Sequence, residues 1–317
     1  MITTYIALPP PMPLTDILQT ARRNKIRGGL LGLVIGDCVG LPYEHVRKTQ
    51  LPTREHIEAL LNGGLAKNTV CWSSDSAQSL ALLDSLQTCQ GLNLDDFAHR
   101  LLAWRETGAY TSHGTVIGCG ITTHQALDRL SRGISPELSG NDDEQSNGNG
   151  SLMRCLPLAL WHQGSDSELI RLAIRQSLPT HAHPLSGVVC ATYCLVARQL
   201  LKEQPIDWDL LIAMLEPQLR PTEHAQLPKI FDVSQRYHPQ GTAYVVDCFW
   251  SAMHTLHANN FSEAIEIAIQ LGNDTNTTAC VAGGLAGIRF GLAGLPMFWR
   301  EFMDTNAVLK QYSDITM

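Results

Sequence analysis

Two clusters of short oxygen-bearing side chains lie at opposite ends of the chain, and each comes directly before an apolar run. One is residues 72–76 (WSSDS), and the other is residues 272–278 (GNDTNTT). At the start of a helix, Asp, Asn, Ser and Thr side chains accept hydrogen bonds from the free N–H groups of the first turn. The same oxygens are preferred ligands of hard cations such as Mg²⁺. Helix caps alone would not require two matching clusters, so the pairing favours a shared metal site.

A long polar segment, residues 133–150 (GISPELSGNDDEQSNGNG), interrupts the helical periodicity. Such a segment is typical either of a flexible surface loop or of a functional loop, and the residues leave both interpretations open. Its far end opens a predicted helix with free backbone N–H groups, which suits a pyrophosphate or another anion. This predicted anion-binding stretch comprises Ser146, Asn147, Gly148, Asn149, Gly150 and Ser151.

Two imidazoles follow in residues 180–184 (THAHP), where His181 and His183 are two positions apart. Such a pair is often ordinary loop chemistry without a metal. A zinc site would need further Cys or His ligands at characteristic spacings. None lies nearby in the sequence, so we do not expect zinc.

Apolar residues recur at helical spacing along most of the chain, as at Leu80, Leu83 and Leu86. No convincing alternating run with hairpin turns is present, so the predicted fold class is all-α. No linker divides it, and we expect a Pro-containing extension at residues 1–25 before a single domain at 26–317. Helices are predicted at residues 74–86, 94–105, 122–130, 151–161, 168–176, 184–201, 208–215, 243–256, 262–271 and 277–290.

Glycine recurs every four residues near both ends of the chain, which would place one bare stripe on each of two helices. Glycine inside a helix costs up to about 1 kcal/mol relative to Ala, so a repeated stripe indicates close approach by a neighbouring backbone. We expect the two helices to pack tightly, with Pro42 ending the first and Glu44 on the loop beyond. The stripes are Gly28, Gly32, Gly36 and Gly40 in one helix and Gly283, Gly287 and Gly291 in the other.

The composition excludes several classes of protein. The 317 residues are 44% apolar and 17% charged, with a net charge of −7 and no basic run, which argues against a nucleic-acid partner. No apolar stretch of about 18 residues is free of charge or Gly, so no membrane span is expected. Nine Cys without a CxxC pair, together with a start lacking a positive leader, favour a cytoplasmic protein.

Taken together, these segments resemble the ADP-ribosylglycohydrolase family over about residues 26–294. No single motif is decisive, but the ordered set is specific. A stretch similar to the family's G-Y-V-V-D, residues 241–247 (GTAYVVD), lies among them. The five ordered motifs are residues 32–44 (GLVIGDCVGLPYE), 72–76 (WSSDS), 149–154 (NGSLMR), 180–181 (TH) and 272–279 (GNDTNTTA).

The resemblance implies a compact, orthogonal multi-helix bundle whose cleft holds two Mg²⁺ ions, or Mn²⁺ in their place. It implies hydrolysis of the glycosidic bond between ADP-ribose and a protein side chain, such as arginine. The 146–151 loop would hold phosphates and ribose with His181 beside it, and Glu44 and Asp75 would be catalytic. The metal ligands on the matching positions would be Ser73, Ser74, Asp75, Asp274, Asn276 and Thr277.

The chain departs from the family pattern at two ligand positions, where Ser74 and Asn276 replace Asp. Losing two carboxylates weakens a site that must neutralise two dications. One hypothesis is therefore a Mg²⁺-dependent hydrolase of ADP-ribosylated protein. Another is a non-catalytic relative that binds ADP-ribose or acts as an immunity protein against an ADP-ribosyltransferase, with residues 1–25 as a binding arm. In a third, the oxygen clusters are only helix caps.

Overall fold

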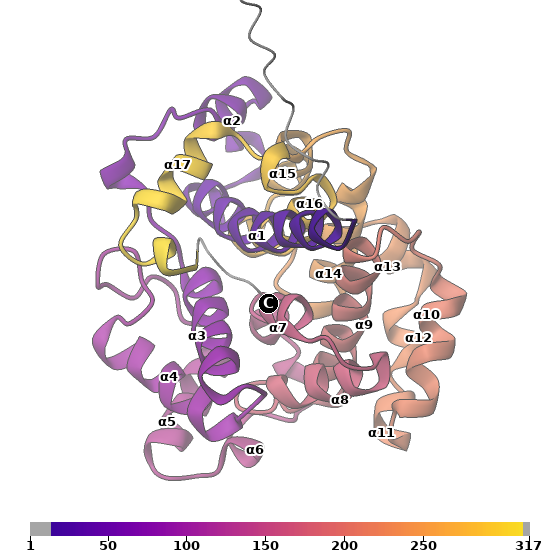
Figure 1. Ribbon diagram of the computed structural model, residues 1–317. Helices are drawn as coiled ribbons and strands as arrows, with labels where there is room; N and C mark the ends of the chain where they lie inside the picture. The colour runs from indigo at the N-terminus through magenta and orange to yellow at the C-terminus, as the bar shows by residue number, and fades with distance from the viewer. Residues whose placement is uncertain (1–13, 313–317) are drawn as a thin grey trace, which may run out of the picture.

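Two long helices, α1 (Leu14–Gly40) and α16 (Thr275–Phe290), form the centre of the molecule in the computed structural model, which describes residues 14–312 (Figure 1). They pack against each other along the glycine stripes. A β-carbon on Gly28, Gly32 or Gly36 would collide with backbone carbonyl oxygens of α16. Only glycine allows this approach, and the predicted tight packing of the two helices is confirmed.

The remaining helices surround this pair. Within residues 14–312 there are no strands, and the two bridges are isolated (Asn141 with His181, Gly148 with Tyr244), which confirms the all-α class. The helices are α2 (Arg54–Leu61), α3 (Ser74–Cys89), α4 (Leu94–Thr107), α5 (Ile121–Ser131), α6 (Pro136–Ser139), α7 (Leu156–Trp161), α8 (Asp166–Ser177), α9 (Pro184–Leu201), α10 (Trp208–Leu215), α11 (Pro221–His224), α12 (Leu227–Ile230), α13 (Val233–Tyr237), α14 (Val245–His254), α15 (Phe261–Gln270) and α17 (Met297–Thr305).

The structure differs from the sequence expectations at the N-terminus. The expected boundary between residues 25 and 26 falls inside α1, which continues without a break from Leu14. Residues 14–25 are therefore the first turns of the central helix. The proline-rich residues 1–13, for which a binding arm was considered, lie outside the described residues. At its other end α1 stops at Gly40, and a single turn containing Pro42 leads to Glu44, as predicted.

Two further differences concern residues 133–161. The polar segment 133–150 is ordered and contains α6 and a short turn, η4 (Glu144–Ser146), with Ser139 and Ser146 buried. The helix expected at 151–161 begins only at Leu156, after an isolated turn, η5 (Asn149–Ser151). Pro157 stands in the first turn of α7, the position that proline favours in a helix, and this explains the late start.

Helices α1 and α9 are long and apolar enough to cross a membrane by length and composition alone. Their apolar windows, however, are 78% and 83% buried inside the protein. The side chains of α9 pack among residues of the core such as Leu156, Phe249 and Val281. Burial between other helices accounts for their composition, because a helix that is apolar on all sides is typical of the core of a large domain.

Candidate active site

The N-termini of α3 and α16 meet at one cavity of about 300 Å³, which combines both oxygen clusters. The loop after α1 and the turn before α7 supply its other walls. Thus all five sequence motifs, although far apart in the chain, contribute residues to one cleft. The predicted residues that line the cavity are Glu44, Ser73, Ser74, Asp75, Gly148, Asn149, Gly150, His181, Asp274, Asn276 and Thr277.

At the start of α3 the capping interpretation holds for one residue. Ser73 Oγ accepts a hydrogen bond from the backbone N–H of Asp75 at 3.2 Å. A second support comes from Asp37 on α1, whose fully buried carboxylate accepts bonds from the backbone N–H groups of Ser73 and Ser76 and from the Ser76 hydroxyl, at 2.7–3.2 Å. A carboxylate is stabilised at a helix N-terminus. Asp37 therefore fixes where α3 begins and aims Ser74 and Asp75 at the cavity.

At the start of α16 the capping interpretation fails. Asp274 occupies the cap position, but its side chain makes no capping hydrogen bond. Its Oδ2 instead accepts a 2.8 Å hydrogen bond from Asn149 Nδ2, across from the turn before α7. The hydroxyl of Thr275 turns away and donates to the carbonyl of Gly40 at the end of α1. Asp274 is thus directed into the cleft rather than onto its own helix.

Two buried oxygen atoms at this cleft lack hydrogen-bond partners among the described residues. They are Asp75 Oδ2 and Asn276 Oδ1. The pKa of Asp75 is raised well above its ordinary value by burial and by the negative charges of Asp37 and Asp274. A buried polar atom without a partner costs free energy, and a set of such oxygens beside a carboxylate is what a bound cation would satisfy.

Glu44 lies at the rim of the same cavity, on the loop after α1, where it is partly open to solvent. Partial burial, and secondly the negative charge of Asp274, raise its pKa above the usual value. A carboxyl group with a raised pKa can take up and release a proton closer to neutral pH than an exposed one. Its place suits a residue that exchanges protons with a bound substrate or water.

His181 forms the floor of the cavity below the 148–150 turn. It is fully buried, and burial together with the positive charge of Arg154 lowers its pKa to about 3, so the ring stays neutral. Its Nδ1 shares a 2.8 Å hydrogen bond with the Thr180 hydroxyl, which leaves Nε2 near the turn. A β-carbon on Gly150 would lie 2.7 Å from the ring, so glycine is required there.

The structure does not bring Ser146, Asn147 and Ser151 to the cavity wall. All three are buried, and Ser146 Oγ donates to Asp143 while Ser151 Oγ accepts from the thiol of Cys190. Asn147 Oδ1 accepts a hydrogen bond from Ser186 Oγ, so Asn147 and Ser151 fasten the loop to α9, while Ser146 bonds within the loop itself. The loop therefore contributes its middle, residues 148–150, to the cleft and uses its ends as anchors.

Sequence reasoning missed several residues of the cleft. A loop and the start of α5 form one wall with residues 118–123, and Met153 and Ala243 complete the lining. The loop is attached through the backbone N–H of Ser74, which donates to the carbonyl of Ile117 at 2.9 Å. No pattern in residues 118–123 indicated this role, because the contact joins segments more than 40 residues apart. Asp37 belongs to the 32–44 motif, but only its buried hydrogen bonds to Ser73 and Ser76 show that it fixes the start of α3.

The donor set of the cleft is poor in carboxylates. Among residues 14–312 no group of three or more His, Cys, Asp or Glu side chains is placed to hold a metal ion. Ser74 and Asn276, at the two positions where the family pattern predicts Asp, line the cavity without adding a carboxylate. Asp75 and Asp274 remain, with hydroxyl and amide oxygens around them.

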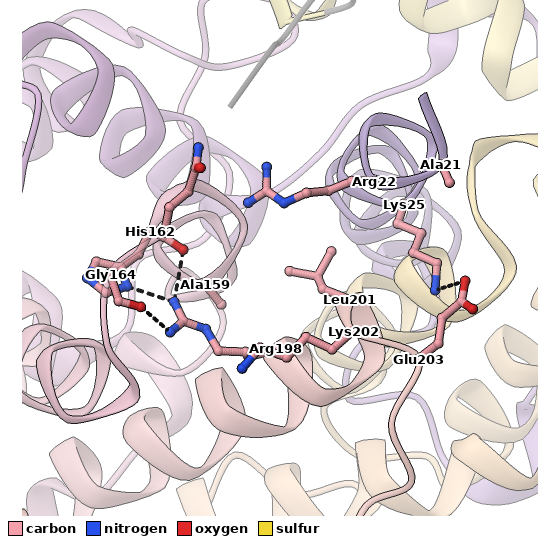
Figure 2. Close-up of a pocket in the computed structure, with 11 residues that line it drawn as sticks. Ala21, Arg22, Lys25, Ala159, His162, Gly164, Arg198, Leu201, Lys202 and Glu203 are labelled. Atoms are coloured by element: carbon pink, nitrogen blue, oxygen red, sulfur yellow. Dashed lines mark hydrogen bonds and ion pairs between the residues drawn. The ribbon is translucent and has the colours of Figure 1, made fainter. Parts of the chain in front are cut away.

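A second cavity of about 470 Å³ lies between the first turns of α1, the end of α7 and the end of α9 (Figure 2). We call it the cation-lined cavity, because Arg22, Lys25, Arg198 and Lys202 form its walls. None of the four is without a partner. Lys25 pairs with Glu203 at 2.9 Å, Asp166 receives Arg198 and Lys202 at 2.9 and 3.7 Å, and Arg22 also has a partner in the chain.

Comparison with known proteins shows the family to which this chain belongs. The family model described as ADP-ribosylglycohydrolase matches residues 18–316. The chain belongs to the ADP-ribosylglycohydrolase family. The resemblance inferred from the ordered motifs is confirmed, and the protein is a hydrolase of the ADP-ribosylglycohydrolase type.

Individual relatives cover most of the chain. ADP-ribosylarginine hydrolase Tri1 of Pseudomonas putida is 31% identical over 88% of this chain and 74% of its own length. ADP-ribosyl-[dinitrogen reductase] glycohydrolase of Rhodospirillum rubrum is 27% identical over 89% of this chain and 90% of its own. A solved structure titled ADP-ribosylglycohydrolase-related protein complex has a TM-score of 0.72 and 26% identity, covering 94% of this chain and all of that one.

Proposed function

We propose that the protein hydrolyses the bond between ADP-ribose and an arginine side chain of a modified protein, with a divalent cation bound in the cleft. The observation that carries the proposal is the pair of buried, unpartnered oxygens, Asp75 Oδ2 and Asn276 Oδ1, at a cavity formed by all the family motifs. The names of two relatives, both ADP-ribosylarginine hydrolases, support arginine as the linkage.

The residues of the cleft fit Mg²⁺, with Mn²⁺ as an alternative, since every donor is a hard oxygen. Asp75, Asp274, Asn276 and Thr277 would hold the first ion, while Ser73 and Ser74 offer only hydroxyls for a second. With two carboxylates in place of the four that the family pattern provides, we expect one ion to bind more weakly than the other. When bound, the cation would supply positive charge that orients ribose hydroxyls and polarises a water molecule.

The chain's own residues account for the remaining requirements of hydrolysis. The oxygen of a water molecule bonds to the anomeric carbon, the carbon–nitrogen bond breaks, and the leaving guanidine nitrogen takes up a proton. Glu44 at the rim can accept the proton from the water. Neutral His181 can form a hydrogen bond through Nε2 without adding positive charge. The backbone N–H groups of Gly148 and Gly150 can donate hydrogen bonds to ribose or phosphate oxygens.

A second candidate function is binding of ADP-ribose, or of an ADP-ribosyltransferase as an immunity protein, without catalysis. The observation that favours it is the absence, within residues 14–312, of a group of three or more His, Cys, Asp or Glu side chains placed to hold a metal ion. Both candidates fit a cytoplasmic protein, since none of the nine cysteines, all of which lie within the described residues, forms a disulfide.

The decisive experiment measures ADP-ribose release from an arginine-ADP-ribosylated protein with Mg²⁺, with Mn²⁺ and with a chelator. We expect metal-dependent release, reduced on the order of a hundredfold by Asp274→Ala, since Asp274 is a proposed ligand and loss of even a residue that orients a ligand typically costs about 10- to 100-fold. The matched control is Asp207→Ala, which removes an exposed helix-capping carboxylate far from the cleft. Tight ADP-ribose binding without release at any metal concentration would instead establish the binder.

A further inference from the structure

Residues 240–244, the short segment before α14, touch both halves of the cleft. The carbonyl of Gly241 accepts the backbone N–H of Asp274 at 2.8 Å, and the carbonyl of Ala243 accepts that of Asn149 at 2.9 Å. These two site residues then meet each other through the 2.8 Å bond from Asn149 Nδ2 to Asp274. The segment therefore sets the distance between the loop before α7 and the start of α16.

The same segment also reaches the rim that carries Glu44. The carbonyl of Gln240 accepts a 2.8 Å bond from Asn273 Nδ2, and the carbonyl of Asn273 accepts the backbone N–H of His45. His45 directly follows Glu44. Asn273 has a positive φ of 57°, a backbone conformation that needs support from its surroundings. A displacement of residues 240–242 would thus reach Glu44 as well as Asp274.

One carboxylate holds this segment in place. Asp247, in the first turn of α14, is 5% exposed, and its Oδ1 accepts the backbone N–H of Gln240 at 2.8 Å. Its Oδ2 accepts both the backbone N–H and the hydroxyl of Thr242, at 2.6 and 2.7 Å. Hydrogen bonds to a charged acceptor are roughly twice as strong as neutral ones. Asp247 does not line the cavity, and all of these hydrogen bonds go to residues 240–242.

We infer that Asp247 is a positioning residue of the active site, which aligns Asn149 with Asp274 through the backbone of residues 240–244. Asp247 belongs to the 241–247 motif. Neither the proposed metal ligands nor the substrate loop includes a residue of that motif. The inference rests on the proposed function, because its consequence is measured on ADP-ribose release. Without Asp247 the cleft keeps every lining side chain but loses their relative placement.

The test is Asp247→Asn, which preserves size and one acceptor oxygen but presents N–H groups to a backbone donor. We expect kcat/KM for ADP-ribose release to fall about tenfold or more, mainly in kcat, since one charge-assisted hydrogen bond is replaced by a repulsive contact. Thr242→Val removes only the hydroxyl bond and should lower kcat/KM about threefold. It serves as the second variant if Asp247→Asn does not fold.

A double-mutant cycle separates positioning from general stability. In an Asn149→Ala background, where the bond to Asp274 is already gone, we expect Asp247→Asn to cost less than about threefold. The same cost in both backgrounds, or unchanged release by Asp247→Asn, would overturn the inference. The control is Asp207→Asn, whose carboxylate caps α10 and should leave release unchanged. Failure of the proposed function is distinct, because the wild-type protein would then show no release.

Discussion

The active-site cleft and the cation-lined cavity differ in how their polar groups are satisfied. The cleft is the smaller of the two, at about 300 Å³ against about 470 Å³. In the larger cavity Arg198 donates to the carbonyls of Gly164 and His162 (Figure 2). Arg198 also donates to Asp166, and Lys25 donates to the carbonyl of Leu200 at the end of α9. In the cleft, by contrast, two buried oxygens have no partner among the described residues.

This difference indicates that a ligand-binding site is distinguished by buried polar groups without partners, and not by the volume of its cavity. The cations of the larger cavity complete the ends of α7 and α9, where free carbonyl groups favour positive charge. Each of these cations has a partner within the chain. The Nε2 atom of His162 in this cavity makes no hydrogen bond within residues 14–312, but it lies 3.2 Å from a carboxylate oxygen of Glu168. The arrangement of Asp75 and Asn276 is incomplete, and proteins keep such costly groups where function requires them. Substitutions in the two regions should therefore have opposite consequences.

The largest expected effect on activity is in the cleft. Asp75→Asn should lower ADP-ribose release on the order of a hundredfold, because it removes one of the two carboxylates proposed as metal ligands. In the presence of a chelator the same variant should unfold at a higher temperature than the wild type. The reason is that burial and the charges of Asp37 and Asp274 disfavour the ionised side chain. Release assays and thermal unfolding at neutral pH test the loss of activity and the gain of stability. A variant that is active and less stable than the wild type would contradict both expectations.

The cation-lined cavity should behave in the reverse way. Arg198→Ala leaves His162 and Asp166 without their buried partner and should lower the free energy of unfolding by about 3 kcal/mol or more. Turnover by the folded variant should stay within about twofold of wild type. Lys202→Ala, which breaks a half-exposed pair at 3.7 Å, should cost less than about 1 kcal/mol. Urea denaturation and release assays test these values, and a large loss of turnover by folded Arg198→Ala would assign function to this cavity.

A gain of function should sharpen the assignment of the cleft. Ser74→Asp combined with Asn276→Asp restores two carboxylates and should raise Mg²⁺ affinity on the order of tenfold, since affinity for hard cations follows ligand charge. Calorimetric titration of the metal-free variants measures the change. Ser76→Asp is unsuitable as a control, because Ser76 bonds Asp37; the exposed Ser131→Asp is the better one. Unchanged Mg²⁺ affinity would show that these positions do not face the ion.

The last prediction concerns the pH dependence of stability that the buried imidazole of the cleft confers. The pKa of His181 is about 3 in the folded protein, against about 6.5 when unfolded. Between these values the unfolded chain binds more protons, so stability is present above pH 6.5 and falls as the pH is lowered toward 3. From pH 7 to 5 the loss should be on the order of 2 kcal/mol. Urea denaturation of His181→Asn should show a correspondingly weaker pH dependence; an identical one would refute the assignment.

Most helices, and the contact between α1 and α16, could be predicted from the sequence alone. Helical spacing placed α9 and α10 at their observed bounds, and the two glycine stripes predicted the packing of α1 against α16. These features depend on local periodicity and on the absence of a side chain, both of which are visible in a linear chain. The ordered motifs likewise identified the family and most of the cleft's residues.

Whether each oxygen cluster caps its helix or faces the cleft became clear only from the tertiary structure. Ser73 caps its helix, whereas Asp274 turns away from its own helix toward Asn149, 125 positions earlier in the chain. Asp37 fixes the start of α3, 36 to 39 positions later in the chain, and Ser151 is held by Cys190 of α9. Hydrogen bonds between distant segments form only once the helices have packed, so residue types and spacing alone could not assign them.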